Sequence, residues 1–287
     1  MSDSNSRIFK AALLASLLAV GIPLLAQRAH NFSPGFNLFS KEQDMQLGQE
    51  SAAQVRKQMT VIQDPVLTAY VTRVGKRLMA SREAQESGFP FTFEVVADPS
   101  INAFALPGGP MFINTGLLRA VDNEAQLAGV MGHEMSHVIL RHGTNQASKR
   151  NLFQLGPALA AQLTNKGTLV GQLEQMGIGV FAGGVLLKFS RTAESEADLT
   201  GSHLMSESGY DPMEMARFFN KLNAQGGHGL QFLSDHPNPA NRERAIQQEA
   251  RALPQKRYGS ESGEFKRMKG VVAKIQEPKP KPQAPQN

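Results

Sequence analysis

Apolar positions in the N-terminal part of the chain recur with helical spacing, and each run follows a start signal. Ser40 and Gln43 form a capping box ahead of a run from Met45 to Val55, which predicts a first helix. Asp64-Pro65 is typical of an N-cap followed by the first helical residue. The apolar residues after this pair share one helical face and predict a second helix: Leu67, Val71, Val74 and Leu78.

The hydrophobic period then changes to two, which predicts strands. Residues 91–96 alternate in this way, and two further short strands are expected at 101–106 and 110–115. The turn signal Pro107-Gly108-Gly109 joins the last two. Asp122 is expected to cap a long helix that ends near Gly143.

The C-terminal half is predicted to be helical. Residues 152–188 are rich in Gly, Ala and Leu, and we interpret them as a buried or groove-lining helical pair, since their longest charge-free stretch is too short to cross a bilayer. A helix is expected from near Thr192 to Gly209, another from Asp211-Pro212, and a last amphipathic one around Phe265. The predicted fold class is α+β, mostly helical with a small mixed sheet beside the helical core.

The first 30 residues resemble a targeting segment. Arg7 and Lys10 precede an apolar run at 11–26, which is longer than the roughly 7–15 residues of a signal core and shorter than the roughly 20 of a spanning helix. A cleaved signal peptide and an uncleaved membrane anchor both remain open. Either alternative predicts an exported protein, periplasmic or anchored and facing the periplasm.

The composition of the chain excludes several kinds of functional site. The chain has no cysteine, which excludes disulfides, cysteine zinc sites and thiol nucleophiles. The net charge of +5 comes from the part after residue 253, with eight basic and three acidic residues, so the rest is neutral. A basic tail on a neutral body argues against a nucleic-acid-binding domain. We interpret the tail as solvated, with contact to an anionic membrane surface as the alternative, and expect residues 278–287 to be disordered.

The segment His133-Glu134-Met135-Ser136-His137 predicts a metal site. Its two histidines are four residues apart, so their imidazoles lie on one face of a helix and can bind one zinc ion at about 2.0–2.1 Å. Glu134 would then lie beside the open coordination position, where a general base is needed. We expect one zinc per chain.

A catalytic zinc site usually has a third protein ligand and a water. Glu194 is the candidate, and Asp198 lies one turn further on the same helical face, where it could accept a hydrogen bond from the outer nitrogen of a ligating histidine. The alternative is that these acidic residues only complement the dipole at a helix N-terminus. We assign that structural role to Glu196.

Together these motifs resemble the M48 family of metallopeptidases, which includes the CAAX prenyl protease and bacterial periplasmic quality-control proteases. They are His-Glu-x-x-His, Ser-Arg-x-x-Glu-x-x-Ala-Asp from Ser190, and His-Pro with an Arg six residues after that His. The resemblance spans roughly residues 40–248 and favours the soluble, exported branch. It implies a zincin-like fold over a peptidase domain at 31–277, with zinc ligands His133, His137 and Glu194, the base Glu134 and the supporting acid Asp198.

The resemblance also implies roles outside the two ligand helices. The strand containing Asn102, Ala103, Phe104 and Ala105 matches the edge strand that pairs with extended protein or peptide substrate. His236 would either bind the zinc and keep the enzyme latent or, with Arg242, stabilise the oxyanion. His142, His203 and His228 have no such support and are interpreted as surface or helix-end residues.

The most favoured function is a zinc-dependent endopeptidase that hydrolyses peptide bonds in misfolded or exported proteins, using zinc-activated water. A second hypothesis is a chaperone or assembly factor for outer-membrane or exported proteins, with secondary peptidase activity. The apolar segment 152–188 and the basic tail keep that hypothesis open. A membrane-anchored CAAX-type processing enzyme is a weaker alternative, since the spanning helices of that branch are missing.

Overall fold

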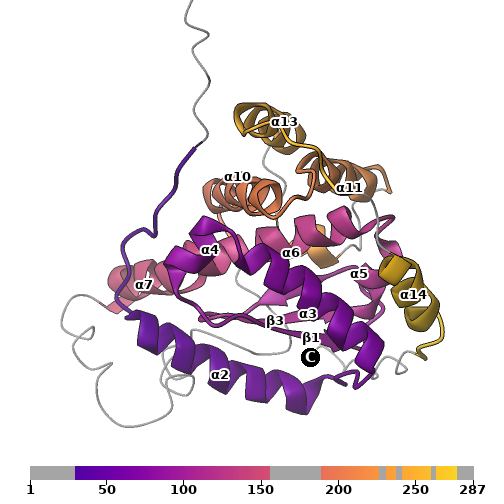
Figure 1. The fold of residues 1–287 in the computed structure, drawn as a ribbon. Helices are drawn as coiled ribbons and strands as arrows, with labels where there is room; N and C mark the ends of the chain where they lie inside the picture. Colours follow the sequence, from indigo (N-terminus) through magenta and orange to yellow (C-terminus); the bar gives the residue numbers. More distant parts are fainter. Residues whose placement is uncertain (1–29, 156–188, 226–230, 237–240, 260–262, 277–287) are drawn as a thin grey trace, which may run out of the picture.

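The computed structural model describes residues 30–155, 189–225, 231–236, 241–259 and 263–276 (Figure 1). The leader up to residue 29, the apolar segment from residue 156, His228, Pro237 and the tail from residue 277 lie outside the described residues. Among the described residues, no helix combines the length and the apolar character needed to cross a membrane.

Local capping explains where the first helices begin. In front of α2 (Lys41–Gln58), Ser40 accepts a bond from the Gln43 amide and the Gln43 side chain accepts one from the Ser40 amide, so the capping box is confirmed. Asp64 accepts bonds from the Val66 and Leu67 amides and starts α3 (Pro65–Met79) as predicted. A short helix, α4 (Arg82–Ser87), follows.

The three predicted strands form one mixed sheet in the order β1-β3-β2. β1 (Thr92–Val96) is parallel to β3 (Pro110–Asn114), and β2 (Ala103–Ala105) is antiparallel to β3. Each observed strand is a little shorter than the range predicted from the hydrophobic pattern. The turn between β2 and β3 contains Gly108 and Gly109 with φ of 75° and 120°, values that glycine adopts without strain.

The described helices that follow the sheet are α5 (Thr115–Ala120), α6 (Glu124–Ile139), α7 (His142–Leu155), α10 (Arg191–Glu207), α11 (Met213–Ala224), α12 (Gln231–Asp235), α13 (Arg242–Ala252) and α14 (Gly263–Val272). The start of α6 corrects the prediction: Asn123 accepts the capping bond from the Gln126 amide, while Asp122 pairs with Lys221. The helix also ends earlier than expected, because Arg141 has a left-handed backbone with φ of 56°.

Helix α6 is the central element of the fold. It lies between the sheet with α3 on one side and α10, α11 and α13 on the other (Figure 1), and nearly all of its residues are buried. The helices α6 and α10 approach closely at Gly201 of α10, where an added Cβ would lie only 3.1 Å from the backbone nitrogen of His133. This crossing sets the distance between the two helices that carry the metal-ligand motifs.

Candidate metal centre

His133 and His137 lie one turn apart on α6, as their spacing predicts, and both are buried. Their Nε2 atoms are 3.1 Å apart. The apolar residues around them on α6 pack into the main hydrophobic core, so the backbone that carries both rings is held rigidly.

Glu194 comes from the first turn of α10, which Ser190 caps by accepting a bond from the Ala193 amide. Its carboxylate is fully buried and meets both rings: Oε2 is 3.3 Å from His133 Nε2, and Oε1 is 3.5 Å from His137 Nε2. The structure therefore brings together the three residues that sequence analysis proposed as ligands.

His236 directly follows α12 and joins the same cluster. Its Nδ1 is 3.2 Å from His133 Nε2 and 3.1 Å from Glu194 Oε1. Each of the four residues His133, His137, Glu194 and His236 offers one ligand atom, and these atoms all lie within 4.8 Å of one another. These four described residues form a group that could hold a metal ion.

The spacing of these atoms fits a tetrahedral metal. Metal–ligand bonds of about 2.0–2.1 Å in a tetrahedron separate the ligand atoms by about 3.3 Å. The closest contacts in the cluster run from 3.1 to 3.5 Å. His133 Nδ1 is 2.9 Å from Asp198 Oδ1, although the two atoms are not aligned for a hydrogen bond. A proton on Nδ1 removes the repulsion between its lone pair and the carboxylate oxygen. The lone pair on its Nε2 then faces other electron-rich atoms, which a cation would hold together.

The electrostatics of the cluster favour metal binding by Glu194 and His137. Burial raises the pKa of Glu194, but hydrogen bonds and charge from His133 and His236 outweigh it and hold the pKa well below its usual value. Burial also lowers the pKa of His137, so this ring is neutral. At His133, the effect of burial is outweighed by Asp198 and Glu194, which raise the pKa, so a metal ion would have to displace a proton from this ring. Ionised carboxylates and neutral imidazoles are the forms that bind a metal.

Glu134 is buried on the side of the cluster that faces the sheet. Against the larger effect of burial, the backbone of Ala105 in β2 acts on this carboxyl group in the direction that lowers its pKa. Its Oε1 is 3.2 Å from His236 Nε2, although the two atoms are not aligned for a hydrogen bond. Burial raises the pKa of Glu134 to about 7. A carboxyl group with a raised pKa can exchange protons near neutral pH.

Arg242, the first residue of α13, contacts the two carboxylates of α10 and not the space between the ligand atoms. Its Nε donates to Asp198 Oδ2 at 2.6 Å, and its Nη2 donates to Glu194 Oε2 at 2.8 Å. The guanidinium also lies over the ring of Phe219, 4.3 Å from its centre. Arg242 thus neutralises two buried carboxylates and fixes their orientation.

The predicted substrate strand lies next to this cluster. Ala103, Phe104 and Ala105 form β2 at one edge of the sheet, and Asn102 directly precedes them. The Asn102 side chain donates to Asp235 Oδ2 at 3.1 Å. This bond ties the start of β2 to the end of α12, next to His236.

Two histidines that sequence analysis placed at the surface or at helix ends are buried. His142 does begin α7, but it is 8% exposed and contacts both His137 and Glu196. His203 is bonded to Glu83 and Glu249. Glu196, predicted to complement the helix dipole, has His142 as its specific partner. In the sequence, the contact between His137 and His142 is suggested only by their closeness along the chain. Two residues that are five positions apart do not lie on the same face of a helix, so the spacing did not predict the contact.

Comparison with known proteins agrees with the geometry. The sequence profile of peptidase family M48 matches residues 65–250. The beta-barrel assembly-enhancing protease of Yersinia pestis is 31% identical over 252 residues, which cover 81% of this chain and 51% of that protein. Its counterpart in Shigella flexneri is 33% identical over 213 residues, or 70% of this chain and 42% of that protein.

A mitochondrial relative shows the same similarity. The mitochondrial metalloendopeptidase OMA1 of Schizosaccharomyces pombe is 35% identical over 184 residues, covering 63% of this chain and 52% of that protein. The chain spans about half the length of these curated relatives. The family profile covers well over half of the chain and includes the candidate ligands on α6 and α10. The chain therefore belongs to peptidase family M48.

Proposed function

We propose that this chain is a zinc-dependent endopeptidase with a zincin-like active site. One observation carries the proposal: the ligand atoms of His133, His137 and Glu194 converge at the spacing of a tetrahedral metal, next to the buried carboxylate of Glu134. Family membership favours the same activity, because the relatives are named as proteases. We place the peptidase domain at residues 31–277.

His133, His137 and Glu194 would hold one zinc ion per chain. When bound, zinc lowers the pKa of a coordinated water and polarises the carbonyl group of the substrate. Asp198 orients the ring of His133 through Nδ1, and Arg242 holds Asp198 and Glu194 in place. The protein thereby fixes the ligand geometry before the metal arrives.

Glu134 would serve as the general base and then as the general acid. Its carboxylate accepts a proton from the attacking water and delivers that proton to the nitrogen of the leaving amine. Burial excludes bulk water from this group.

The substrate would bind as an added strand at the edge of the sheet. β2 pairs with β3 on one side and lies at the end of the strand order, so an extended peptide can pair with its other side. The packing of β2 against α6 supports this placement, because α6 carries the proposed base Glu134. Residues 102–105 would then align the scissile bond with the metal centre.

His236 would keep the resting enzyme latent. Its Nδ1 lies at the spacing of a fourth ligand, and its Nε2 faces Glu134. A site with four protein ligands has no position for the attacking water. This arrangement favours the latency role over oxyanion stabilisation, and the contacts of Arg242 favour a positioning role for that residue.

The physiological setting follows from the leader and the relatives. We propose that residues 1–30 direct export as a signal peptide or an anchor, and that the substrates are misfolded or exported proteins. An assembly-factor role is the second candidate, because two of the relatives are named beta-barrel assembly-enhancing proteases. An assembly function that survives loss of peptidase activity would support this second role.

Metal analysis and a casein digest test the proposal. Purified protein should contain one zinc per chain, and a chelator should abolish both the zinc and any cleavage. Changing His133, His137 or Glu194 to Ala should remove the zinc. Full zinc retention in Glu194→Ala would mean that the third ligand lies elsewhere, and activity unaffected by a chelator would refute the zinc mechanism.

A further inference from the structure

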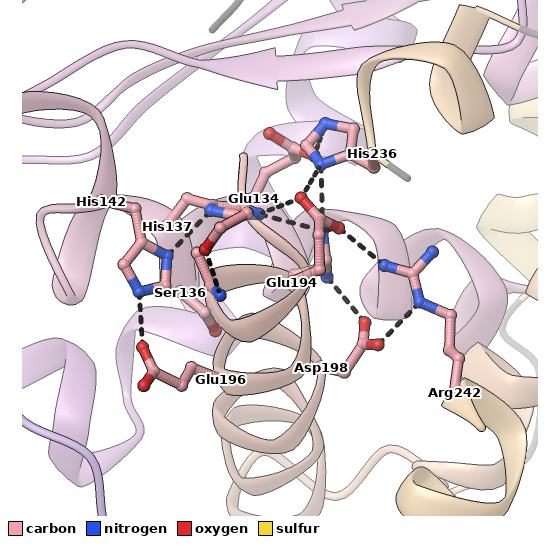
Figure 2. Close-up of polar contacts among 12 residues, drawn as sticks. Glu134, Ser136, His137, His142, Glu194, Glu196, Asp198, His236 and Arg242 are labelled. Carbon is pink, nitrogen blue, oxygen red and sulfur yellow. Dashed lines mark hydrogen bonds and ion pairs between the residues drawn. The ribbon is translucent and has the colours of Figure 1, made fainter. Parts of the chain in front are cut away.

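His142 lies between one of the proposed zinc ligands and a carboxylate near the surface. Its Nδ1 is 2.9 Å from His137 Nδ1, and its Nε2 is 3.1 Å from Glu196 Oε2 (Figure 2). The His142 side chain is 9% exposed, whereas the Glu196 side chain is 33% exposed. The three side chains therefore form a continuous hydrogen-bonded row from the metal cluster to the edge of the protein.

The proton positions along this row follow from its chemistry. A neutral imidazole that uses Nε2 as a ligand atom carries its proton on Nδ1, so His137 donates from Nδ1. His142 must then accept at its own Nδ1 and carry its proton on Nε2. Glu196 accepts a hydrogen bond from this Nε2–H group. Both ring nitrogens of His142 then have a hydrogen-bond partner.

The turn after α6 places His142 in this position. Arg141 has φ of 56°, a left-handed conformation that is uncommon for residues with a side chain. Its side chain is held from two sides, by Asp44 Oδ2 at 2.6 Å and by the carbonyl oxygen of Phe39 at 2.6 Å. This turn starts α7 in a new direction and brings His142 back against His137.

The two ligands of α6 are thus supported in different ways by α10. His133 meets Asp198 directly, at 2.9 Å. Among the described residues, His137 Nδ1 contacts the ring of His142 and reaches the Glu196 carboxylate through it. A ligating histidine needs an acceptor at its outer nitrogen to fix its tautomer and orientation.

We propose that His142 is a positioning residue that holds His137 in the metal-binding tautomer and orientation, with Glu196 as its acceptor and the Arg141 turn as its support. The proposal rests on the zinc site proposed above. It gives a role to His142 and Glu196, which are not part of the three-ligand motif.

Zinc affinity measured by competition with a chelator tests this role directly. The probe is Zn²⁺ added to metal-free protein, and circular dichroism verifies that each variant is folded. His142→Ala should weaken zinc binding about 10–100-fold, the usual cost of removing such a partner. Glu196→Ala should weaken it less, because water can replace a partly exposed acceptor. Glu196→Gln should restore most of the affinity, since its amide oxygen accepts the same bond.

His203→Ala is the matched control. His203 is also a buried histidine bonded to carboxylates, but those are Glu83 and Glu249, and it contacts none of the proposed ligands. This variant should lose stability without losing zinc affinity. The visible spectrum of Co²⁺-substituted protein should change in His142→Ala, because the His137 ring reorients, and should stay unchanged in His203→Ala.

Each outcome decides one question. If the unchanged protein binds no Zn²⁺, the proposed zinc function fails before the positioning role is reached. If it binds Zn²⁺ and His142→Ala binds equally well with the same Co²⁺ spectrum, the positioning role is refuted. If His142→Ala does not fold, the comparison of Glu196→Ala with Glu196→Gln decides, and equal, wild-type affinity in both would overturn the proposal.

Discussion

Glu134 and Glu194 are buried carboxylates in the same centre, but their surroundings prepare them for different roles. Glu194 has Arg242 and the histidines around it, and its pKa lies well below the usual value. Burial dominates at Glu134 and raises its pKa to about 7. When the surroundings of two carboxyl groups in one site give them different pKa values, the groups can have different roles. Here the group with the low pKa is the proposed ligand and the group with the raised pKa is the proposed base.

The role of Glu134 predicts the effect of its amide variant. Glu134→Gln should retain zinc and fold, because Glu134 is not among the clustered ligand atoms, but it should lose about 10²–10⁴ in turnover. The reason is that an amide cannot accept the proton of the attacking water. Casein cleavage by zinc-loaded variant protein measures the loss, and turnover near the wild-type rate would show that another group is the base.

The position of His236 predicts that its removal activates the enzyme. His236→Ala should cleave a generic substrate faster at unchanged zinc content, because a fourth ligand no longer occupies the water position. The oxyanion role predicts the opposite sign, a loss on the order of 10²–10³. A rate comparison under identical zinc loading separates the two, and an equal rate would exclude both.

At the scale of elements, the centre depends on how closely α6 and α10 cross. Gly132 and Gly201 face each other there, but their surroundings are not equivalent. A Cβ on Gly201 would lie 3.1 Å from the His133 nitrogen and 3.2 Å from the Gly132 carbonyl carbon, whereas one on Gly132 would find its nearest atom at 3.4 Å. Backbone atoms of a packed helix cannot move aside as a flexible side chain can.

This asymmetry predicts different effects for the same change. Gly201→Ala should destabilise the protein by about 1–3 kcal/mol and weaken zinc binding, because it separates Glu194 from the histidines of α6. Gly132→Ala should be neutral or stabilising by up to about 1 kcal/mol, since Ala is the better helix former. Urea unfolding and zinc titration of both variants measure the effects, and equal stabilities would contradict the packing argument.

At the scale of the whole molecule, a second charged cluster joins distant parts of the chain. His203 of α10 donates to Glu83 of α4 and to Glu249 of α13, and His30 of the N-terminal segment also bonds Glu249. Burial lowers the pKa of His203, but the two glutamates outweigh it and raise the pKa to about 9. The pKa values of Glu83 and Glu249 are lowered, because His203 offsets the cost of their burial.

These directions predict how stability depends on pH. The folded state holds the His203 proton more tightly than the unfolded state does, so this contribution is complete below about pH 6.5 and is lost as pH rises towards about 9. The glutamate contributions are present above about pH 4.5 and are lost in acid. The free energy of unfolding should therefore fall above pH 6.5 with a slope of up to about 1.4 kcal/mol per pH unit.

Urea unfolding between pH 6.5 and 9.5 measures this slope. In His203→Gln the slope should be smaller, because the ring that releases the proton is gone. A variant with the wild-type slope would show that other groups control stability in this range.

Much of the helical fold and the core of the site were accessible from sequence because their signals are local. The capping box at Ser40 and the Asp64-Pro65 start depend on a few adjacent residues, and both are confirmed. The convergence of His133 and His137 follows from the helical period alone. The motif around Glu194 lies on a helix, as predicted, and that helix brings its carboxylate to the histidines.

Tertiary structure decided the partners that no local rule specifies. The acceptor of His137 is Glu196 through His142, and this row exists because Arg141 adopts a left-handed turn held by Asp44, which lies 97 residues earlier in the chain. The approach of His236 to the ligand atoms likewise depends on α12 packing beside β2. The sequence by itself determined which residues could hold a metal, since ligand chemistry and helical spacing are local properties. Only packing decided which groups orient those ligands, because such contacts join segments whose distance apart depends on the whole core.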